Sequence, residues 1–387
     1  MAATMERTWD EQRSKRARVA TLQDQMKRND MGALLLGGGI GVRYLLGVPV
    51  PSARIFVPAE GEVIGFVRQR DIEYVRSHHA TVRLALSEQD VADGCRALDR
   101  NGRMACTVAD LMEEHGVAGE RLGVEEITMG LLIGLIRGGV DVVDARDALE
   151  RAMAIKTDDE IVMYRAIADQ YVNTMRVFQE ASVPGTTENA LADVVTTAWR
   201  ETGGEEVSQL NVCSGENMNP WRRWPTDRVL KSGEFVGIDL HARGINGLRG
   251  DVSRTFFVGD DPTPEQRALY REAFQYVQET IPIFKVGLTF AEIAEAAPPV
   301  PAPYQKQQFS YNIAHGVGMG SSGYPKIHAH ERDSESVLAP NQILAVECHF
   351  GEAGSTLAVK LEEMIVVREG QPEWLTKDVP FDDRLLS

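Results

Sequence analysis

The chain of 387 residues is longer than one typical domain, so we expect at least two folded units. Its hydrophobic and charged fractions, 43% and 25%, are ordinary for a globular protein and argue against an intrinsically disordered chain. The formal net charge of -16 argues against a nucleic-acid partner, because binding phosphates requires clustered Lys and Arg side chains. A small-molecule substrate is the expected partner.

The N-terminus is charged throughout, and no segment is apolar for long enough to be a signal peptide or to span a bilayer. We therefore expect no membrane partner. The cysteines form no CxxC pair, so neither a zinc ribbon nor a disulfide framework is expected from Cys95, Cys106, Cys213 and Cys348. This cysteine usage favours the reducing cytoplasm.

The elements predicted before residue 156 are those of a small α/β domain, which we place at residues 1–155. The segment from about Thr8 to Asn29 predicts a helix, and short apolar runs separated by Gly and Pro predict strands. A glycine run at Gly37 to Gly41 follows the first strand. It lacks the full spacing and the acidic partner of a dinucleotide-binding loop, so we interpret it as a tight turn.

A second domain is expected at residues 156–387. Thr157 and Glu160 have the spacing of a capping box, which predicts a long helix that ends before Pro184 and Gly185. Later helical segments at 189–202 and 265–284 are interspersed with strand-like runs, without the regular alternation of a parallel sheet. The expected fold class is α+β, with a mostly antiparallel sheet covered by helices.

Acidic and imidazole side chains share faces of the predicted strands in this second domain. Because side chains alternate along a strand, Asp239 and His241 point the same way. A hairpin through residues 244–250 can set Asp251 across from Asp239. The same alternation gives two further pairs, Glu347 with His349 and Lys360 with Glu362.

These acids are flanked by apolar residues, which favours central, buried strands over an exposed sheet face. Several buried carboxylates destabilise a fold unless a cation lies between them. Oxygen-rich ligation with an imidazole suits Mn, Fe, Co or Zn better than a thiolate site would. We therefore expect two divalent transition-metal ions, held by Asp239, Asp251, His315, Glu347 and Glu362.

The order of these five residues resembles that of the pita-bread metalloenzymes, which include methionine aminopeptidase, prolidase and aminopeptidase P. Further matches are the sequences HGVGMG, VECHFG, VKLEEMIVV, SGEN at 214–217 and DVSRTF from Asp251. The resemblance covers residues 155–387, and the two-domain layout is similar to the creatinase, prolidase and aminopeptidase P branch. It implies a homodimer in which Asp251 and Glu362 bridge the two metals, while Glu347 could also assist proton transfer.

Two positions depart from the peptidases of this branch, which carry histidines where this chain has Arg222 and Ser322. Those imidazoles serve proline-type substrates and stabilise the tetrahedral intermediate. A closer resemblance is to the dimethylsulfoniopropionate lyases of the same fold, the DddP type. It rests on NPW at 219–221, QKQQF before HGVG, the twelve-residue gap from Asp239 to Asp251, and LTKDVPFD near the C-terminus.

The resemblance to these lyases implies iron chemistry and a further metal ligand at His241. Alternation along the strand also predicts that the side chain of His241 points toward the metal. The alternative is a histidine hydrogen-bonded beside the site. The lyases carry an Asp base where this chain has Ser321, and a serine hydroxyl cannot remove an α-proton without a base of its own. The candidates for that role are Glu347, His328 and His330, although the two histidines also suit an exposed loop.

Aromatic and basic residues near the site are candidates for substrate binding. Trp221, Trp224 and Tyr324 could hold a sulfonium or quaternary ammonium by cation–π attraction, and Arg222 with Arg223 could bind a carboxylate. Packing in a loop is the alternative for the two tryptophans.

The predicted function is a metal-dependent, DddP-type lyase acting on a small, non-peptide, zwitterionic acid. An Xaa-Pro peptidase or another amide hydrolase is the alternative, and a non-enzymatic binding module, which loss of metal ligands would indicate, is the third hypothesis.

Overall fold

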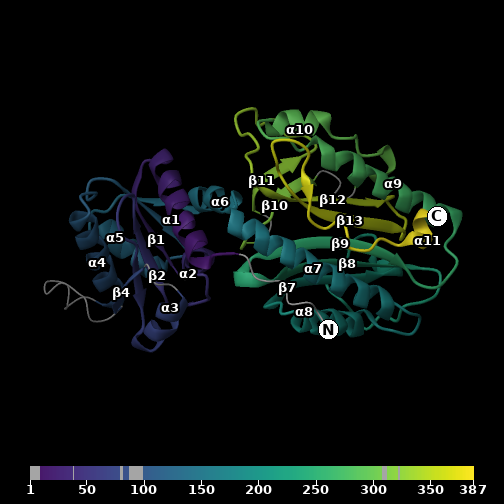
Figure 1. The fold of residues 1–387 in the computed structure, drawn as a ribbon, viewed down its shortest axis with the longest axis horizontal. Coiled ribbons are helices and arrows are strands. Elements are labelled where there is room, and N and C mark those ends of the chain that lie inside the picture. The colour runs from purple at the N-terminus through teal and green to yellow at the C-terminus, as the bar shows by residue number, and fades with distance from the viewer. Residues whose placement is uncertain (1–8, 38, 79–81, 87–98, 307–311, 321–322) are drawn as a thin grey trace. The chain divides into compact units, whose positions relative to one another are not determined.

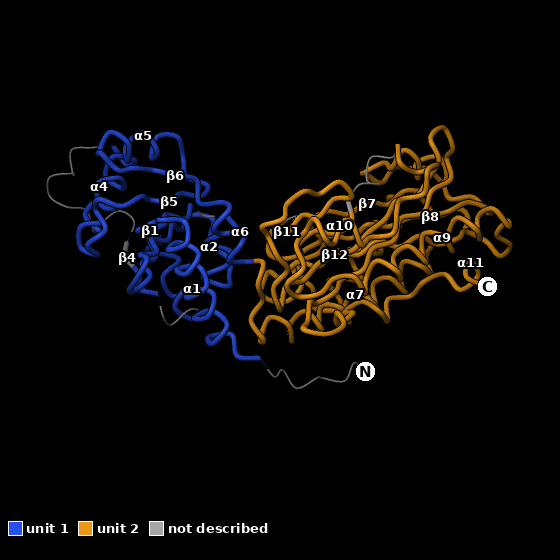
Figure 2. Tube along the Cα trace, turned by 90° about the horizontal axis from the view of Figure 1, so that it is seen from above, with its two compact units in different colours: residues 1–153 blue, residues 154–387 orange. Residues whose placement is uncertain are grey.

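The computed structural model describes residues 9–37, 39–78, 82–86, 99–306, 312–320 and 323–387. The chain divides into two compact units, Met1–Met153 and Ala154–Ser387, shown in different colours in Figure 2. This division lies two residues before the boundary predicted at 155/156. Among the described helices, none is both long and apolar enough to cross a membrane.

The first unit is built on a mixed six-stranded sheet with the strand order β4-β3-β2-β1-β5-β6. Its strands are β1 (Met31–Leu36), β2 (Arg54–Pro58), β3 (Ile64–Val67), β4 (Arg83–Leu86), β5 (Arg121–Glu125) and β6 (Val142–Asp144). Its helices are α1 (Glu11–Arg28), α2 (Ile40–Leu46), α3 (Ile72–His78), α4 (Arg100–Glu114), α5 (Met129–Arg137) and α6 (Arg146–Ala154). Apolar side chains of α4 and α5 pack with those of the central strands in one core.

Two sequence interpretations in this unit need adjustment. The glycine run leads into α2, with Gly39 as the N-cap residue, so the chain enters a helix there. Cys106 is disulfide-bonded, whereas the sequence predicted no disulfide, because the sequence spacing of cysteines does not report their distance in space. In the second unit, Cys213 and Cys348 are free, buried thiols.

The helices of the second unit begin with α7 (Asp158–Ala181), and the predicted capping box at its start is confirmed. The backbone N–H of Thr157 donates to Glu160 Oε2 at 2.7 Å, and the N–H of Glu160 donates to Thr157 Oγ1 at 3.2 Å. The remaining helices are α8 (Glu188–Glu201), α9 (Pro264–Thr280), α10 (Phe290–Ala296) and α11 (Asp383–Leu386). A short 3-10 turn, η6 (Ala302–Tyr304), follows α10.

Two antiparallel sheets form the centre of the second unit (Figure 1). One has the strand order β7-β8-β9, and the other has the order β11-β10-β12-β13-β14. Their strands are β7 (Glu206–Ser214), β8 (Phe235–Arg243), β9 (Arg249–Phe257), β10 (Asn312–Gly316), β11 (Gly323–His328), β12 (Ile343–Gly351), β13 (Ala358–Val366) and β14 (Glu373–Trp374). Helices α7 and α8 lie outside the first sheet and α9 outside the second, which confirms the predicted α+β fold.

The two sheets meet where β9 and β13 lie side by side. Thr255 on β9 joins them, because its hydroxyl donates to the carbonyl oxygen of Lys360 and accepts from the N–H of Lys360, both at 3.0 Å. Side chains on the inner faces of both sheets therefore approach one another along this line. The candidate site lies there.

The hairpin of β8 and β9 has a different register from the one predicted. Asp251 lies opposite His241, not opposite Asp239. The reason is that the hairpin closes at the pair Arg243 and Arg249, with a five-residue loop between them. The side chains of Asp239, His241 and Asp251 nevertheless share one face, as alternation requires.

Candidate metal centre

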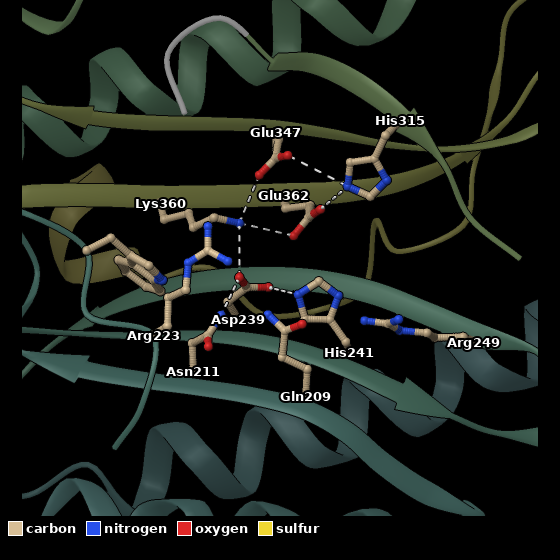
Figure 3. Close-up of a pocket in the computed structure, with 11 residues that line it drawn as sticks. Gln209, Asn211, Arg223, Asp239, His241, Arg249, His315, Glu347, Lys360 and Glu362 are labelled. Atoms are coloured by element: carbon tan, nitrogen blue, oxygen red, sulfur yellow. Dashed lines mark hydrogen bonds and ion pairs between the residues drawn. The ribbon is translucent and has the colours of Figure 1, made fainter. Parts of the chain in front are cut away.

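The six residues predicted as metal ligands lie together where the two sheets meet, and five of them line a cavity of about 300 Å³ (Figure 3). All six are buried, with between 1% and 8% of the residue surface exposed. They come from five strands: Asp239 and His241 from β8, Asp251 from β9, His315 from β10, Glu347 from β12 and Glu362 from β13. The fold thus concentrates carboxylates and imidazoles that are far apart in the sequence.

One group of donor atoms surrounds His315. Its Nε2 lies 3.7 Å from Oδ2 of Asp251, 3.7 Å from Oε1 of Glu347 and 3.4 Å from Oε1 of Glu362. Ligand atoms that each lie about 2.0–2.2 Å from one ion are themselves separated by about 3 to 3.6 Å. Ligand atoms of Asp251, His315 and Glu362 therefore lie close enough together to hold a single transition-metal ion, and Glu347 adjoins this group.

A second group surrounds His241, whose Nδ1 lies 2.7 Å from Oδ2 of Asp251 and whose Nε2 lies 3.2 Å from Oδ1 of Asp239. Among the described residues, the buried Oδ1 atom of Asp251 has no hydrogen-bond partner. Buried carboxylate oxygens without a partner are the atoms that a hard cation would satisfy. The two groups share Asp251, so the residues fit a pair of ions.

Carboxylates control the charge state of both imidazoles in the metal-free protein. Burial lowers the pKa of His241, but Asp251 and Asp239 outweigh it and raise the pKa to about 10. Burial also lowers the pKa of His315, and its neighbouring carboxylates raise it to about 9. Since a metal binds the neutral imidazole, metal binding here should release protons.

Lys360 is a central residue of the cavity to which the sequence assigned no role. Its Nζ lies 3.0 Å from Oε2 of Glu347, 3.4 Å from Oε2 of Glu362 and 3.5 Å from Oδ2 of Asp239. Burial would lower the pKa of Lys360, but these carboxylates raise it well above the ordinary value. The buried ammonium therefore compensates part of the negative charge and leaves the other oxygen of each carboxylate for a metal.

Ser253 fixes this arrangement from the neighbouring strand. Its hydroxyl accepts from Lys360 Nζ and donates to Oε2 of Glu362, both at 2.7 Å. Alternation along the strand predicts Lys360 on the same face as Glu362, so part of the signal was present in the sequence. What the sequence did not contain was the contact between β9 and β13.

Strand β7 supplies two cavity residues that the sequence analysis missed. Asn211 lies opposite Asp239 and donates from Nδ2 to its Oδ2 at 2.9 Å, and Gln209 lies opposite His241. The segment EVSQLNVCS is too polar to stand out as a strand. The only indication of a strand in this segment is that two polar residues, Gln209 and Asn211, occupy alternate positions.

Of the predicted substrate-binding residues, Trp221 lines the cavity. It is buried, and its ring lies edge-on to His349, with centroids 5.6 Å apart. Arg222 and Trp224 are exposed and are not among the lining residues, whereas Arg223 between them is. Neighbours on one loop point in different directions, which sequence position alone does not reveal.

The other candidates lie on or near β11. Tyr324 packs against Phe290, with ring centroids 5.6 Å apart, and does not line the cavity. His328 and His330 are exposed and do not line it either, because alternation on β11 buries Ile327 and turns His328 outward. Ser321 and Ser322 lie outside the described residues.

Comparison with known families agrees with this geometry. The family model of metallopeptidase family M24 matches residues 163–369, more than half of the chain. The chain belongs to metallopeptidase family M24. The family model of the creatinase/prolidase N-terminal domain matches residues 18–152. The two matches confirm the resemblance to the creatinase and prolidase branch in both domains.

Relatives of this M24 protein differ in activity. It is 25% identical over 402 residues to the dimethylsulfoniopropionate lyase DddP of Roseovarius nubinhibens, covering 97% of this chain and 88% of the lyase. It is 24% identical over 351 residues to the uncharacterized peptidase YqhT of Bacillus subtilis, covering 89% of this chain and 93% of that protein. The solved Xaa-Pro dipeptidase from Bacillus anthracis has a TM-score of 0.79 at 18% identity, covering 95% of this chain and 99% of that one, which confirms the pita-bread fold.

Proposed function

We propose that this M24 protein is a metal-dependent lyase of the DddP type, which cleaves a small zwitterionic acid such as dimethylsulfoniopropionate. The observation that carries the proposal is the lining of the cavity. Around the candidate metal ligands lie an ammonium, guanidinium groups and carboxamides, from Lys360, Arg223, Arg249, Asn211 and Gln209. Such groups suit a compact charged substrate, and the likeness to DddP over nearly the whole chain supports the same activity.

Two divalent ions, iron or manganese first and zinc or cobalt next, would be held by the groups around His315 and His241. When bound, they would act as Lewis acids that increase the acidity of the α-hydrogen of a substrate carboxylate. Lys360 would hold the outer oxygens of Glu347 and Glu362 in place during the reaction. Its charge also limits the repulsion among the carboxylates.

The elimination needs one proton acceptor among the chain's own residues. The Cα–H bond breaks, its electron pair forms the Cα=Cβ bond, and the Cβ–S bond breaks with its pair remaining on sulfur. The products are dimethyl sulfide, acrylate and a proton. Glu347 is the proposed acceptor, because it lines the cavity, whereas His328 and His330 do not. Trp221 offers an aromatic face in the same cavity for the sulfonium group.

An Xaa-Pro dipeptidase or another amide hydrolase is the second candidate function. The observation that favours it is the complete set of five ligand residues, which the chain has in common with the peptidases it resembles. Against it, this chain has Arg222 at the position of the first histidine of those peptidases, and Arg222 is exposed and does not line the cavity.

We also propose that the protein is a homodimer, as its resemblance to the creatinase and prolidase branch implies, and that it is cytoplasmic, as expected from the sequence. Light scattering of the purified chain tests the dimer, and fractionation of the producing cells tests the location. Twice the chain mass of 42.7 kDa is the expected solution mass.

Product analysis tests the proposed function. The purified protein is loaded in turn with Fe(II), Mn(II), Zn(II) and Co(II) and incubated with dimethylsulfoniopropionate. Headspace chromatography should detect dimethyl sulfide, and liquid chromatography an equal amount of acrylate, with loss of both after chelation. Release of proline from Xaa-Pro dipeptides without any dimethyl sulfide would replace the lyase with the peptidase.

A further inference from the structure

We infer that Arg249 is a carboxylate-binding residue of this cavity, so that the ligand of the site carries a carboxylate. Arg249 is the first residue of β9, two positions before Asp251, and alternation puts both side chains on one face. It lines the cavity, and Figure 3 shows its guanidinium pointing toward His241. The inference deepens the proposed function by naming a substrate group, and it holds for either reaction considered above.

Among the described residues, the Nε and Nη2 atoms of the buried Arg249 side chain have no hydrogen-bond partner. Only 6% of the residue is exposed. Within the described part of the chain, no acidic side chain forms an ion pair with it. A buried charge in this condition destabilises the folded protein, so an anion in the cavity would stabilise it.

Another buried arginine of the same strand shows how the fold treats a structural guanidinium. Arg254 is fully buried, and it donates to the backbone carbonyls of Ser253, Glu362, Val379 and Pro380 and to the carboxylate of Glu363. Every nitrogen of Arg254 is thus satisfied inside the protein. Arg249 differs in having its donors directed at a cavity, which is the arrangement of a ligand-binding residue.

The backbone of Arg249 is held on both sides. Its N–H donates to the carbonyl oxygen of Gly318 at 3.1 Å, and its carbonyl oxygen accepts from the hydroxyl of Tyr164 at 3.2 Å. A fixed backbone lowers the entropy lost when the guanidinium engages a ligand. The planar fork of N–H donors matches the two oxygens of a carboxylate, which favours bidentate binding.

Binding of propionate to the metal-loaded protein tests the inference, with propionamide as the uncharged probe of the same shape. In isothermal titration, Arg249→Gln should weaken propionate binding at least tenfold and leave propionamide binding unchanged. Arg332→Gln removes the same charge from an exposed position and should bind propionate like the wild type. Equal propionate affinity in the wild type and Arg249→Gln would overturn the inference, as would binding of inorganic phosphate in place of propionate.

Thermal unfolding without ligand supplies a second readout. Arg249→Met removes an unpaired buried charge and should leave the protein at least as stable as the wild type. A purely structural arginine would lose stability instead, which would contradict the inference. Arg249→Lys keeps the charge but loses the fork, so weakened propionate binding is expected from it even if the Gln variant does not fold.

These results separate the inference from the proposed reaction. Propionate binding that depends on Arg249, with no dimethyl sulfide produced, would reject the lyase and keep the carboxylate site. Dimethyl sulfide production by Arg249→Gln with an unchanged KM would reject the carboxylate site and keep the lyase.

Discussion

The ammonium nitrogen of Lys360 lies 3.0 Å from Oε2 of Glu347, and both residues are buried. The same nitrogen reaches carboxylate oxygens of Glu362 and Asp239, so one cation is surrounded by three of the proposed metal ligands. This contact links a side chain of β12 to a side chain of β13. The ammonium group of Lys360 allows the acids to be buried before any metal is bound. Removing the cation should therefore change stability and metal binding together.

Lys360→Met is expected to destabilise the metal-free protein by about 3–5 kcal/mol, because it leaves buried carboxylates without their partner. Urea unfolding with a chelator present measures this effect, and Lys360→Arg should recover most of the loss. Added metal should stabilise the Met variant more than it stabilises the wild type. Identical unfolding curves for the wild type and Lys360→Met without metal would show that the ammonium is not compensating the acids.

Single ligand substitutions should affect the two metal positions differently. His241→Gln removes a donor from one group only, so elemental analysis after gel filtration should find one ion retained instead of two. Asp251→Asn alters the residue that both groups share and should reduce both. Full retention of two ions by His241→Gln would favour the alternative of a histidine hydrogen-bonded beside the site.

Gly237 on β8 allows Trp221 to pack against the strand. A Cβ atom at Gly237 would lie 2.9 Å from ring atoms of Trp221 and 3.0 Å from Cε of Met218. Gly237→Ala should therefore displace the indole, with a loss of about 1–3 kcal/mol in unfolding free energy and a shift in tryptophan emission. Gly370→Ala, where a Cβ meets open space, is the control. An unchanged emission spectrum and unchanged stability in Gly237→Ala would contradict this packing.

Glu125 in the first unit should make stability depend on pH. Burial, with a contribution from Glu126, raises its pKa from 4.5 to about 7. The stabilising effect of the neutral carboxyl is complete below pH 4.5 and is lost as the pH rises through 7. Glu125→Gln should therefore stabilise the protein at pH 8 by about 1–3 kcal/mol and have little effect at pH 4.5.

Denaturant unfolding at both pH values measures that difference. Glu113→Gln changes an exposed carboxyl of the same unit and serves as the control. A difference between Glu125→Gln and the wild type that is equal at pH 4.5 and pH 8 would show that Glu125 does not titrate with a raised pKa.

Much of the second unit could be predicted from the sequence because its signals are local. The capping box of Thr157 and Glu160 fixed the start of α7, and alternation placed Asp239 with His241 and Lys360 with Glu362 on common faces. The order of the acids along the chain was sufficient to suggest the family. These features depend on neighbours within a few residues, which the sequence shows directly.

What the sequence could not supply depends on contacts between segments far apart. The role of Lys360 depends on β13 lying beside β9. The proposed role of Arg249 depends on the finding that no acidic side chain in the described part of the chain forms an ion pair with it. The sequence also could not predict the direction of each side chain on the loop that follows β7, so it did not distinguish Arg223, which lines the cavity, from Arg222, which does not. Strand β7 was missed because it is rich in polar residues, of which Asn211 and Ser214 are buried beside β8.

Anomalous diffraction from crystals of the iron- or manganese-loaded protein tests the metal centre most directly. We expect two peaks in the cavity, one among Asp251, His315, Glu347 and Glu362 and one among Asp239, His241 and Asp251. Lys360 Nζ should lie outside both coordination spheres. Absence of any peak within bonding distance of Asp251 would contradict the account.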